Sequence, residues 1–81
     1  MRLDKFLKVS RVIKRIRVAN EACDLGRVKI NDNVSKAFAD VKVGDIIEIK
    51  FGENWVKFEV LSLSQSIRKE DAENMVKLIE E

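Results

Sequence analysis

Residues 2–30 read RLDKFLKVSRVIKRIRVANEACDLGRVKI and contain two helical patterns followed by a strand-like alternation. The first pattern predicts a helix over about residues 3–10, because apolar and small side chains recur at the spacing of one helix face. That face would carry Leu3, Phe6, Leu7 and Ser10. Residues 11–16 are expected to bend away from the helix, with three apolar anchors: Val12, Ile13 and Ile16.

A second helix is predicted over about residues 17–25. Its apolar stripe would be Val18, Ala22 and Leu25, with the small Ala19 and Cys23 beside it. Gly26 follows at the position where a left-handed residue commonly ends a helix. Apolar and basic residues then alternate over 27–30, which predicts a half-buried strand with a basic face.

The middle of the chain predicts short antiparallel strands. Asn and Asp at 31–33 indicate a turn, since both tolerate left-handed backbone, and Val34 is expected to resume pairing before a loop over 35–40. Two alternating runs on either side of GEN, residues 52–54, predict a hairpin packed against the helices.

The tail, residues 66–81, is predicted to form a third helix with Ser66 as its N-cap. Acidic residues would favour its first turns, namely Glu70, Asp71 and Glu73. Its apolar stripe would be Ala72, Met75, Val76 and Ile79. The fold class expected is therefore α+β, in one domain over 1–81: two short N-terminal helices on a small antiparallel sheet, plus a C-terminal helix.

Composition excludes several classes of protein. The chain has 81 residues, of which 46% are apolar and 37% charged, as in a folded domain. It has no His and one Cys, and we find no catalytic constellation, phosphate loop or metal-ligand cluster, so we expect no enzyme activity, cofactor or metal. We expect Cys23 to be a packed side chain. No apolar run approaches a membrane span or a signal peptide, so a cytoplasmic location is expected.

Positive charge is concentrated at the amino end of the chain. Residues 1–17 contain seven Lys or Arg and one acidic residue, while the whole chain carries a net charge of only +2. The candidate contacts around the two helices are Lys5, Lys8, Arg11, Lys14, Arg15 and Arg17, and Arg27, Lys29 and Lys36 extend them onto the strand and loop. A helix starting near Arg17 would also direct unpaired N–H groups to this zone, which suits phosphate.

RNA is the favoured anion. The second helix offers Asn20, Glu21 and Asp24 outward, a poor surface to insert into a DNA groove, whereas charge around its N-terminus suits the backbone of folded RNA. Weak non-specific DNA binding stays open. Trp55 and Phe38 could stack on bases, but we expect both to pack in the fold.

These residues resemble a known family. RLDKFL, then KVSRVIKRIRVANEACDLGRVKINDN, then VKVGDIIEI are similar to the S-four RNA-binding domain, also called the alpha-L motif, over about residues 1–50. Over its full length the chain resembles the RqcP family of stand-alone bacterial ribosome quality control factors. The small heat-shock S-four proteins are the next most similar family. The resemblance implies RNA contacts through Arg2, Lys14 and Arg15. The chain departs from the family at Ile16, where the family usually has Arg. We hypothesise that Arg17 supplies the displaced charge.

The resemblance also implies partners: rRNA of the split large ribosomal subunit, the peptidyl-tRNA on it, and a quality control factor of the NEMF type. With these, the stalled nascent chain would gain a C-terminal alanine tail. No membrane partner is expected, and the chain is expected to be a monomer. Three alternatives stay open: a heat-shock factor that rescues stalled large subunits, a fragment or subunit of an enzyme, and a DNA-binding regulator.

Overall fold

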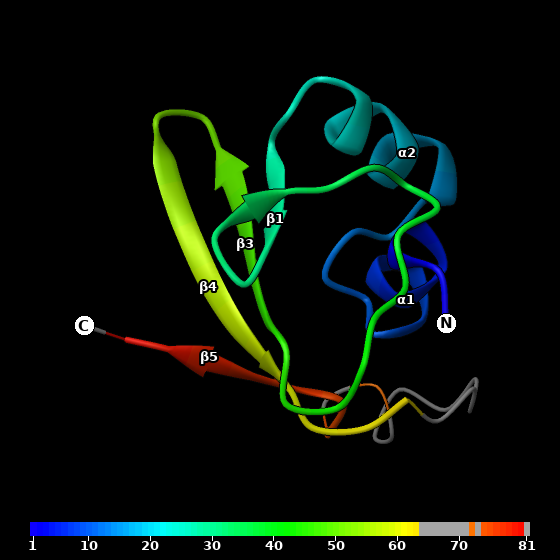
Figure 1. Ribbon diagram of the computed structural model, residues 1–81, viewed down its shortest axis with the longest axis vertical. Coiled ribbons are helices and arrows are strands. Elements are labelled where there is room, and N and C mark those ends of the chain that lie inside the picture. The colour runs from blue at the N-terminus through cyan, green and yellow to red at the C-terminus, as the bar shows by residue number, and fades with distance from the viewer. Residues whose placement is uncertain (64–71, 73, 81) are drawn as a thin grey trace.

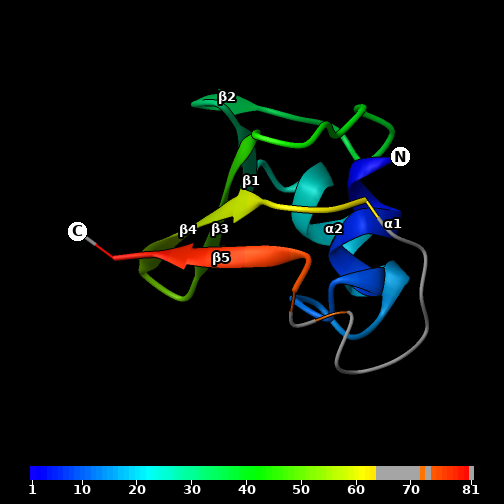
Figure 2. The same cartoon turned by 90° about the horizontal axis from the view of Figure 1, so that it is seen from below.

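A computed structural model describes residues 1–63, 72 and 74–80, and within them two helices pack on one face of a five-stranded sheet (Figure 1). The helices are α1 (Leu3–Val9) and α2 (Ile16–Asp24). Viewed from below, they lie together on one side of the sheet (Figure 2). The α+β class and the two N-terminal helices are thereby confirmed. Neither helix has the length or apolar character needed to cross a bilayer.

The apolar face predicted for the first helix is the one that α1 buries. Leu3, Phe6 and Leu7 are almost completely buried, and Ser10 is buried as the C-cap residue. The Ser10 N–H donates to the Phe6 carbonyl at 2.9 Å, which continues the helical hydrogen bonding by one residue. The helix therefore ends where the apolar spacing ends, and its remaining faces carry lysines.

The buried face of α2 differs from the predicted stripe. Ala19 and Cys23 are fully buried, whereas Val18 is exposed and Leu25, just beyond the helix, is 66% exposed. Small side chains let two helices approach closely, so the alanine and cysteine, rather than the bulkier residues, face α1 and the sheet. Gly26 has φ 72°, which confirms the predicted left-handed end.

The sheet is antiparallel throughout, in the order β2-β1-β3-β4-β5. Its strands are β1 (Val28–Ile30), β2 (Asn33–Val34), β3 (Ile46–Phe51), β4 (Asn54–Val60) and β5 (Val76–Ile79). Asn31 and Asp32 have positive φ, as their turn-forming chemistry predicts. The Asn31 carboxamide also accepts a hydrogen bond from the Ile46 N–H at 2.9 Å and so joins the β1–β2 turn to β3.

The prediction of a C-terminal helix over residues 66–81 is wrong for residues 76–79. Residues 76–79 form β5 and pair with β4, where Lys77 lies opposite Glu59 and Val76 opposite Val60. The exposed edge of β4 offers backbone partners that an isolated helix would lack, and the β-branched residues here suit a strand. The predicted cap Ser66 and the acidic Glu70, Asp71 and Glu73 lie outside the described residues.

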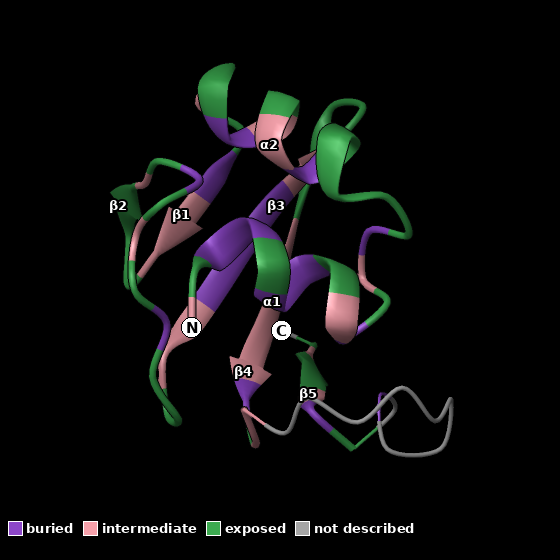
Figure 3. Cartoon of the chain, turned by 90° about the vertical axis from the view of Figure 1, so that its right-hand side faces the viewer, coloured by how far each residue is buried: buried purple, intermediate pink, exposed green. Residues whose placement is uncertain are grey.

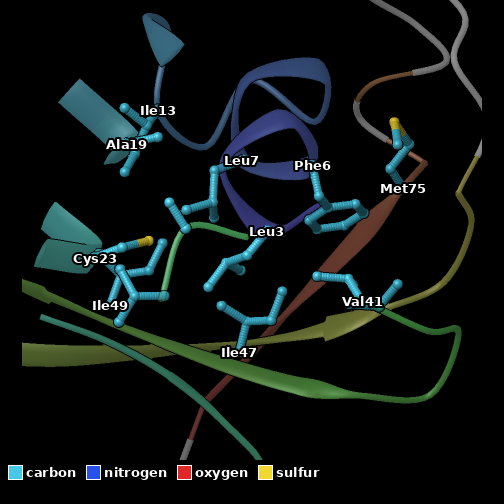
Figure 4. Packing of buried hydrophobic residues seen from close by; sticks show 13 residues of the cluster. Leu3, Phe6, Leu7, Ile13, Ala19, Cys23, Val41, Ile47, Ile49 and Met75 are labelled. Atoms are coloured by element: carbon cyan, nitrogen blue, oxygen red, sulfur yellow. The ribbon is translucent and has the colours of Figure 1, made fainter. Parts of the chain in front are cut away.

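The core lies between the helices and the inner face of the sheet. Figure 4 shows Leu3, Phe6 and Leu7 of α1 directed at Ile47, Ile49 and Val41. In Figure 3 much of α1 and β3 is buried and drawn purple, while exposed green segments recur along both helices. This packing fixes which helix faces remain exposed to solvent, and the exposed faces carry Lys5, Lys8 and Arg17.

Candidate nucleic-acid interface

The outer face of α1 is basic because its inner faces are used for the core. Lys5 and Lys8 are exposed, as predicted. Their aliphatic stems leave from the turns that bury Phe6 and Leu7 on the opposite side. The charges are therefore held on a helix whose orientation is set by core packing.

The connection between the helices is held by backbone hydrogen bonds and by one apolar anchor. Arg11 adopts φ 62°, the left-handed conformation that terminates α1, and its N–H donates to the Lys8 carbonyl at 3.0 Å. Ile13 is buried, and its N–H donates to the Leu7 carbonyl at 3.0 Å. Lys14 and Arg15 follow this anchor directly and are exposed. Their backbone is thus fixed while their side chains face water.

Ile16 is not the anchor that the sequence suggested. It is 45% exposed at the first position of α2, between the exposed Arg15 and Arg17, while Val12 and Ile13 supply the packing. An apolar side chain consequently interrupts the row of cations at the surface.

The start of α2 adds backbone donors to the positive side chains. Arg15 is the N-cap in extended conformation and makes no side-chain capping bond, and the first turn contains Arg17 but no acidic residue. The N–H groups of a first helical turn lack intrahelical partners and form the positive end of the helix dipole. No acidic residue of the first turn offsets that end, so it can add to the attraction for phosphate.

Arg2 has a structural partner that the sequence analysis did not anticipate. Its guanidinium contacts the buried carboxylate of Asp4 at 3.2 and 3.3 Å, and Asn20 of α2 donates to the same carboxylate at 3.3 Å. Asp4 also accepts from the Lys5 N–H at 2.8 Å. The carboxylate therefore ties the start of α1 to α2. The Arg2 side chain still has 59% of its area exposed, which leaves it able to contact a ligand.

Four of the cations form no ion pair within the part of the chain that the structure describes. Lys8, Lys14, Arg15 and Arg17 make neither an ion pair nor a hydrogen bond through their side chains in that part of the chain. An unpaired cation keeps its full attraction for phosphate, since no salt bridge must be broken on binding. We call these four residues the unpaired basic set.

Arg27 and Lys36 occupy different places. Arg27 lies beyond the C-terminal end of α2, whereas Arg17 lies in its first turn. It lines a groove of about 340 Å³ between α2 and the β3–β4 hairpin. Lys36 opens a turn that docks on the start of α1, close to Arg2. The fold thus places Lys36 in a turn beside the start of α1 and Arg27 beyond the far end of α2 from Arg17.

The two aromatic candidates are less buried than predicted. Trp55 is 38% exposed, and the Lys29 ammonium lies 4.3 Å from its ring centroid, a cation–π contact on the sheet. Phe38 is 70% exposed, so the prediction that it packs in the fold is wrong. Its position in a polar turn, between Lys36 and Asp40, was the signal for exposure.

The described residues give no support to other site chemistry. Across the described ranges, no three His, Cys, Asp or Glu residues gather as metal ligands would. Burial, with the charges of Asp4 and Asp24, raises the pKa of the Cys23 thiol to about 11, so the thiol stays protonated at neutral pH. The Asp45 carboxylate accepts a hydrogen bond from the Lys42 N–H at 2.9 Å, which is a turn-forming role.

Comparison with known proteins reveals a family pattern and close relatives. The S4 domain pattern matches residues 1–47. Proteins named RQC P-site tRNA stabilizing factor from Streptococcus pneumoniae and Bacillus subtilis are each 49% identical over all 81 residues, covering 92% and 94% of those proteins. The Helicobacter pylori protein of that name is 33% identical over 78% of this chain and 75% of its own.

Solved structures share the fold. The trimeric structure of Vibrio cholerae Heat Shock Protein 15 aligns with TM-score 0.87 at 24% identity, over 98% of this chain and 81% of that one. The solution structure of the hypothetical protein HP1423 aligns with TM-score 0.83 at 26% identity, over 100% and 99%. The arrangement of two helices on an antiparallel sheet is therefore shared with these proteins.

Proposed function

The chain belongs to the S4 domain family, and from that premise we propose that it is an RNA-binding factor of bacterial ribosome quality control that stabilises tRNA in the P site. The observation that carries the proposal is 49% identity over the full 81 residues to proteins named for that role. The unpaired basic set supports it independently, because exposed cations that form no ion pair within the described residues suit phosphate.

The mechanism follows from how the cations are held. Lys14 and Arg15 project from a connection fixed by Ile13, and the first turn of α2 adds backbone N–H donors beside them. Such a surface recognises backbone geometry rather than base sequence, which suits folded RNA. Arg offers paired N–H donors to one phosphate, so Arg15 and Arg17 would fix orientation as well as affinity.

The finer parts of the proposal concern the partners. We place the protein on split, obstructed large subunits, in contact with rRNA and peptidyl-tRNA, alongside a quality control factor of the NEMF type that supports alanine tailing. Its action there is non-enzymatic and cytoplasmic: it holds the tRNA in place while another factor delivers alanine.

Sedimentation with large ribosomal subunits tests the proposal. The variant Lys8→Gln/Lys14→Gln/Arg15→Gln removes three charges from exposed positions and spares Arg2, whose loss would disturb Asp4. We expect it to lose co-sedimentation at physiological salt while keeping the circular dichroism spectrum of the native chain. The matched control, Lys42→Gln/Lys50→Gln/Lys77→Gln, removes the same charge elsewhere and should still co-sediment.

Two results would reject the proposal. If Lys8→Gln/Lys14→Gln/Arg15→Gln co-sediments as well as the native chain, these three residues do not bind the subunit. Stronger binding of the native chain to duplex DNA than to tRNA at the same salt concentration would favour the DNA-binding alternative instead.

A further inference from the structure

Phe38 is the most exposed large apolar side chain in the described part of the protein, at 70%. Leaving a phenylalanine ring in water forgoes the free energy that its burial would contribute. No packing role accounts for the residue, since the core forms without it. The exposed ring is therefore a candidate contact for a ligand.

The turn that carries Phe38 is held firmly in place. The Ala39 N–H donates to the Lys36 carbonyl at 3.0 Å and closes the turn, and the neighbouring Ala37 is buried. The first residues of α1 then hold it from the side: the Leu3 N–H donates to the Ala39 carbonyl at 2.8 Å, and the Asp4 N–H donates to the Ala37 carbonyl at 3.1 Å. Figure 2 shows this loop beside the amino terminus. The ring is therefore presented from a fixed backbone.

The surroundings of the ring are cationic. Lys36 opens the same turn, and Arg2 pairs through its backbone with Asp40 at the end of the loop. The one acidic group of this loop, Asp40, is bound by the Met1 ammonium at 2.9 Å, which offsets its charge. A flat aromatic face beside exposed cations matches a nucleobase and its phosphates better than it matches a purely apolar protein surface.

We propose that Phe38 stacks on an unpaired nucleobase of the bound RNA, while Lys36 and Arg2 hold the adjacent phosphates. The inference rests on the proposed function, because it adds a second RNA contact at the loop that follows β2, beside the start of α1. It adds a contact that is not ionic and that only unpaired RNA satisfies, since the bases of a duplex are stacked on each other.

The test is fluorescence anisotropy with two labelled probes, a tRNA transcript and a fully paired RNA duplex of similar length. We expect Phe38→Ala and Phe38→Leu to weaken tRNA binding about tenfold, because base–aromatic stacking has that order of magnitude. Phe38→Trp should retain the affinity. Phe38→Leu is the matched control for shape, since it keeps an apolar side chain but has no flat ring. None of these variants should change duplex binding.

Salt dependence separates stacking from charge. Phe38→Ala should leave the slope of log affinity against log salt unchanged, whereas Lys36→Gln should make it shallower by about 0.7 to 0.9. Phe51→Leu alters another exposed phenylalanine, on β3, and should bind tRNA like the native chain. Native affinity for tRNA in Phe38→Leu, or an equal loss on the duplex, would overturn the inference and leave the proposed function standing. Absence of tRNA and subunit binding by the native chain would remove both.

Discussion

Asp4 shows how one side chain changes role between sequence and structure. Within residues 1–17 it is the single acidic residue among seven cations, yet it is only 4% exposed and accepts hydrogen bonds from Arg2, Lys5 and Asn20. Asp4→Asn should lower the free energy of unfolding by about 1–3 kcal/mol, because the amide leaves a buried donor facing other donors. Urea denaturation would measure this, with the exposed Asp24→Asn as the control. Equal midpoints for both variants would contradict the role of Asp4.

Cys23 should be unreactive in the folded protein. Its pKa is raised to about 11 from 9.0, so at a given pH its thiolate is about 100-fold scarcer than that of a free thiol. Because the folded pKa exceeds the unfolded one, stability should also fall as pH rises from about 9 to about 11. Iodoacetamide labelling followed by mass spectrometry should show modification in urea and almost none without it. Rapid labelling of the native chain would contradict the burial.

Ile16 tests how the cations share their task. The site is exposed, so Ile16→Arg should change stability by less than about 0.5 kcal/mol. If the neighbouring Arg17 supplies the charge that the family places at this position, the added Arg should raise affinity for stalled large subunits by less than about threefold. A gain of tenfold or more in a co-sedimentation titration would show that Arg17 does not substitute.

Among the elements, periodicity predicted those whose partners are near in sequence. The spacing in α1, the left-handed Gly26 and the β3–β4 hairpin were all indicated by local chemistry. The final segment was not, because residues 76–79 satisfy a helical spacing in isolation and become a strand only when β4 offers its edge. The face of α2 was also misjudged, since bulk in the sequence does not reveal that close helix packing favours Ala19 and Cys23.

The α1–α2 contact should tolerate little added volume. Ala19 is fully buried on the face that packs in the core, so Ala19→Leu should lower the free energy of unfolding by about 1–3 kcal/mol through overpacking. Val18→Leu, one residue away on the exposed face, should be nearly neutral. Thermal denaturation of both variants would check this. A larger loss for Val18→Leu would mean that the two faces have been assigned the wrong way round.

At the scale of the whole molecule, charge is distributed unevenly over a nearly neutral chain. A net charge of +2 would give little long-range attraction, so binding should depend on the local cations around α1, the connection and the start of α2. The concentration of positive charge over residues 1–17 was predictable, because charged residues can be counted along the sequence. It did not reveal that Arg2 is shared with Asp4, or that Arg27 lies at the far end of α2.

Salt dependence of tRNA binding follows from that distribution. If about five phosphates are neutralised, log affinity should fall against log salt with a slope of about −3.5 to −4.5, because added salt lowers the entropy gained when counterions are released. Lys8→Gln/Lys14→Gln/Arg15→Gln should reduce the magnitude of the slope by about 2.1 to 2.7, whereas Lys42→Gln/Lys50→Gln/Lys77→Gln should leave it unchanged. Anisotropy titrations between about 50 and 300 mM KCl would measure all three slopes. Equal slopes for the native chain and both triple variants would mean that the phosphate contacts lie elsewhere on the surface. The exposed cations beside α2 would then contribute only to solubility.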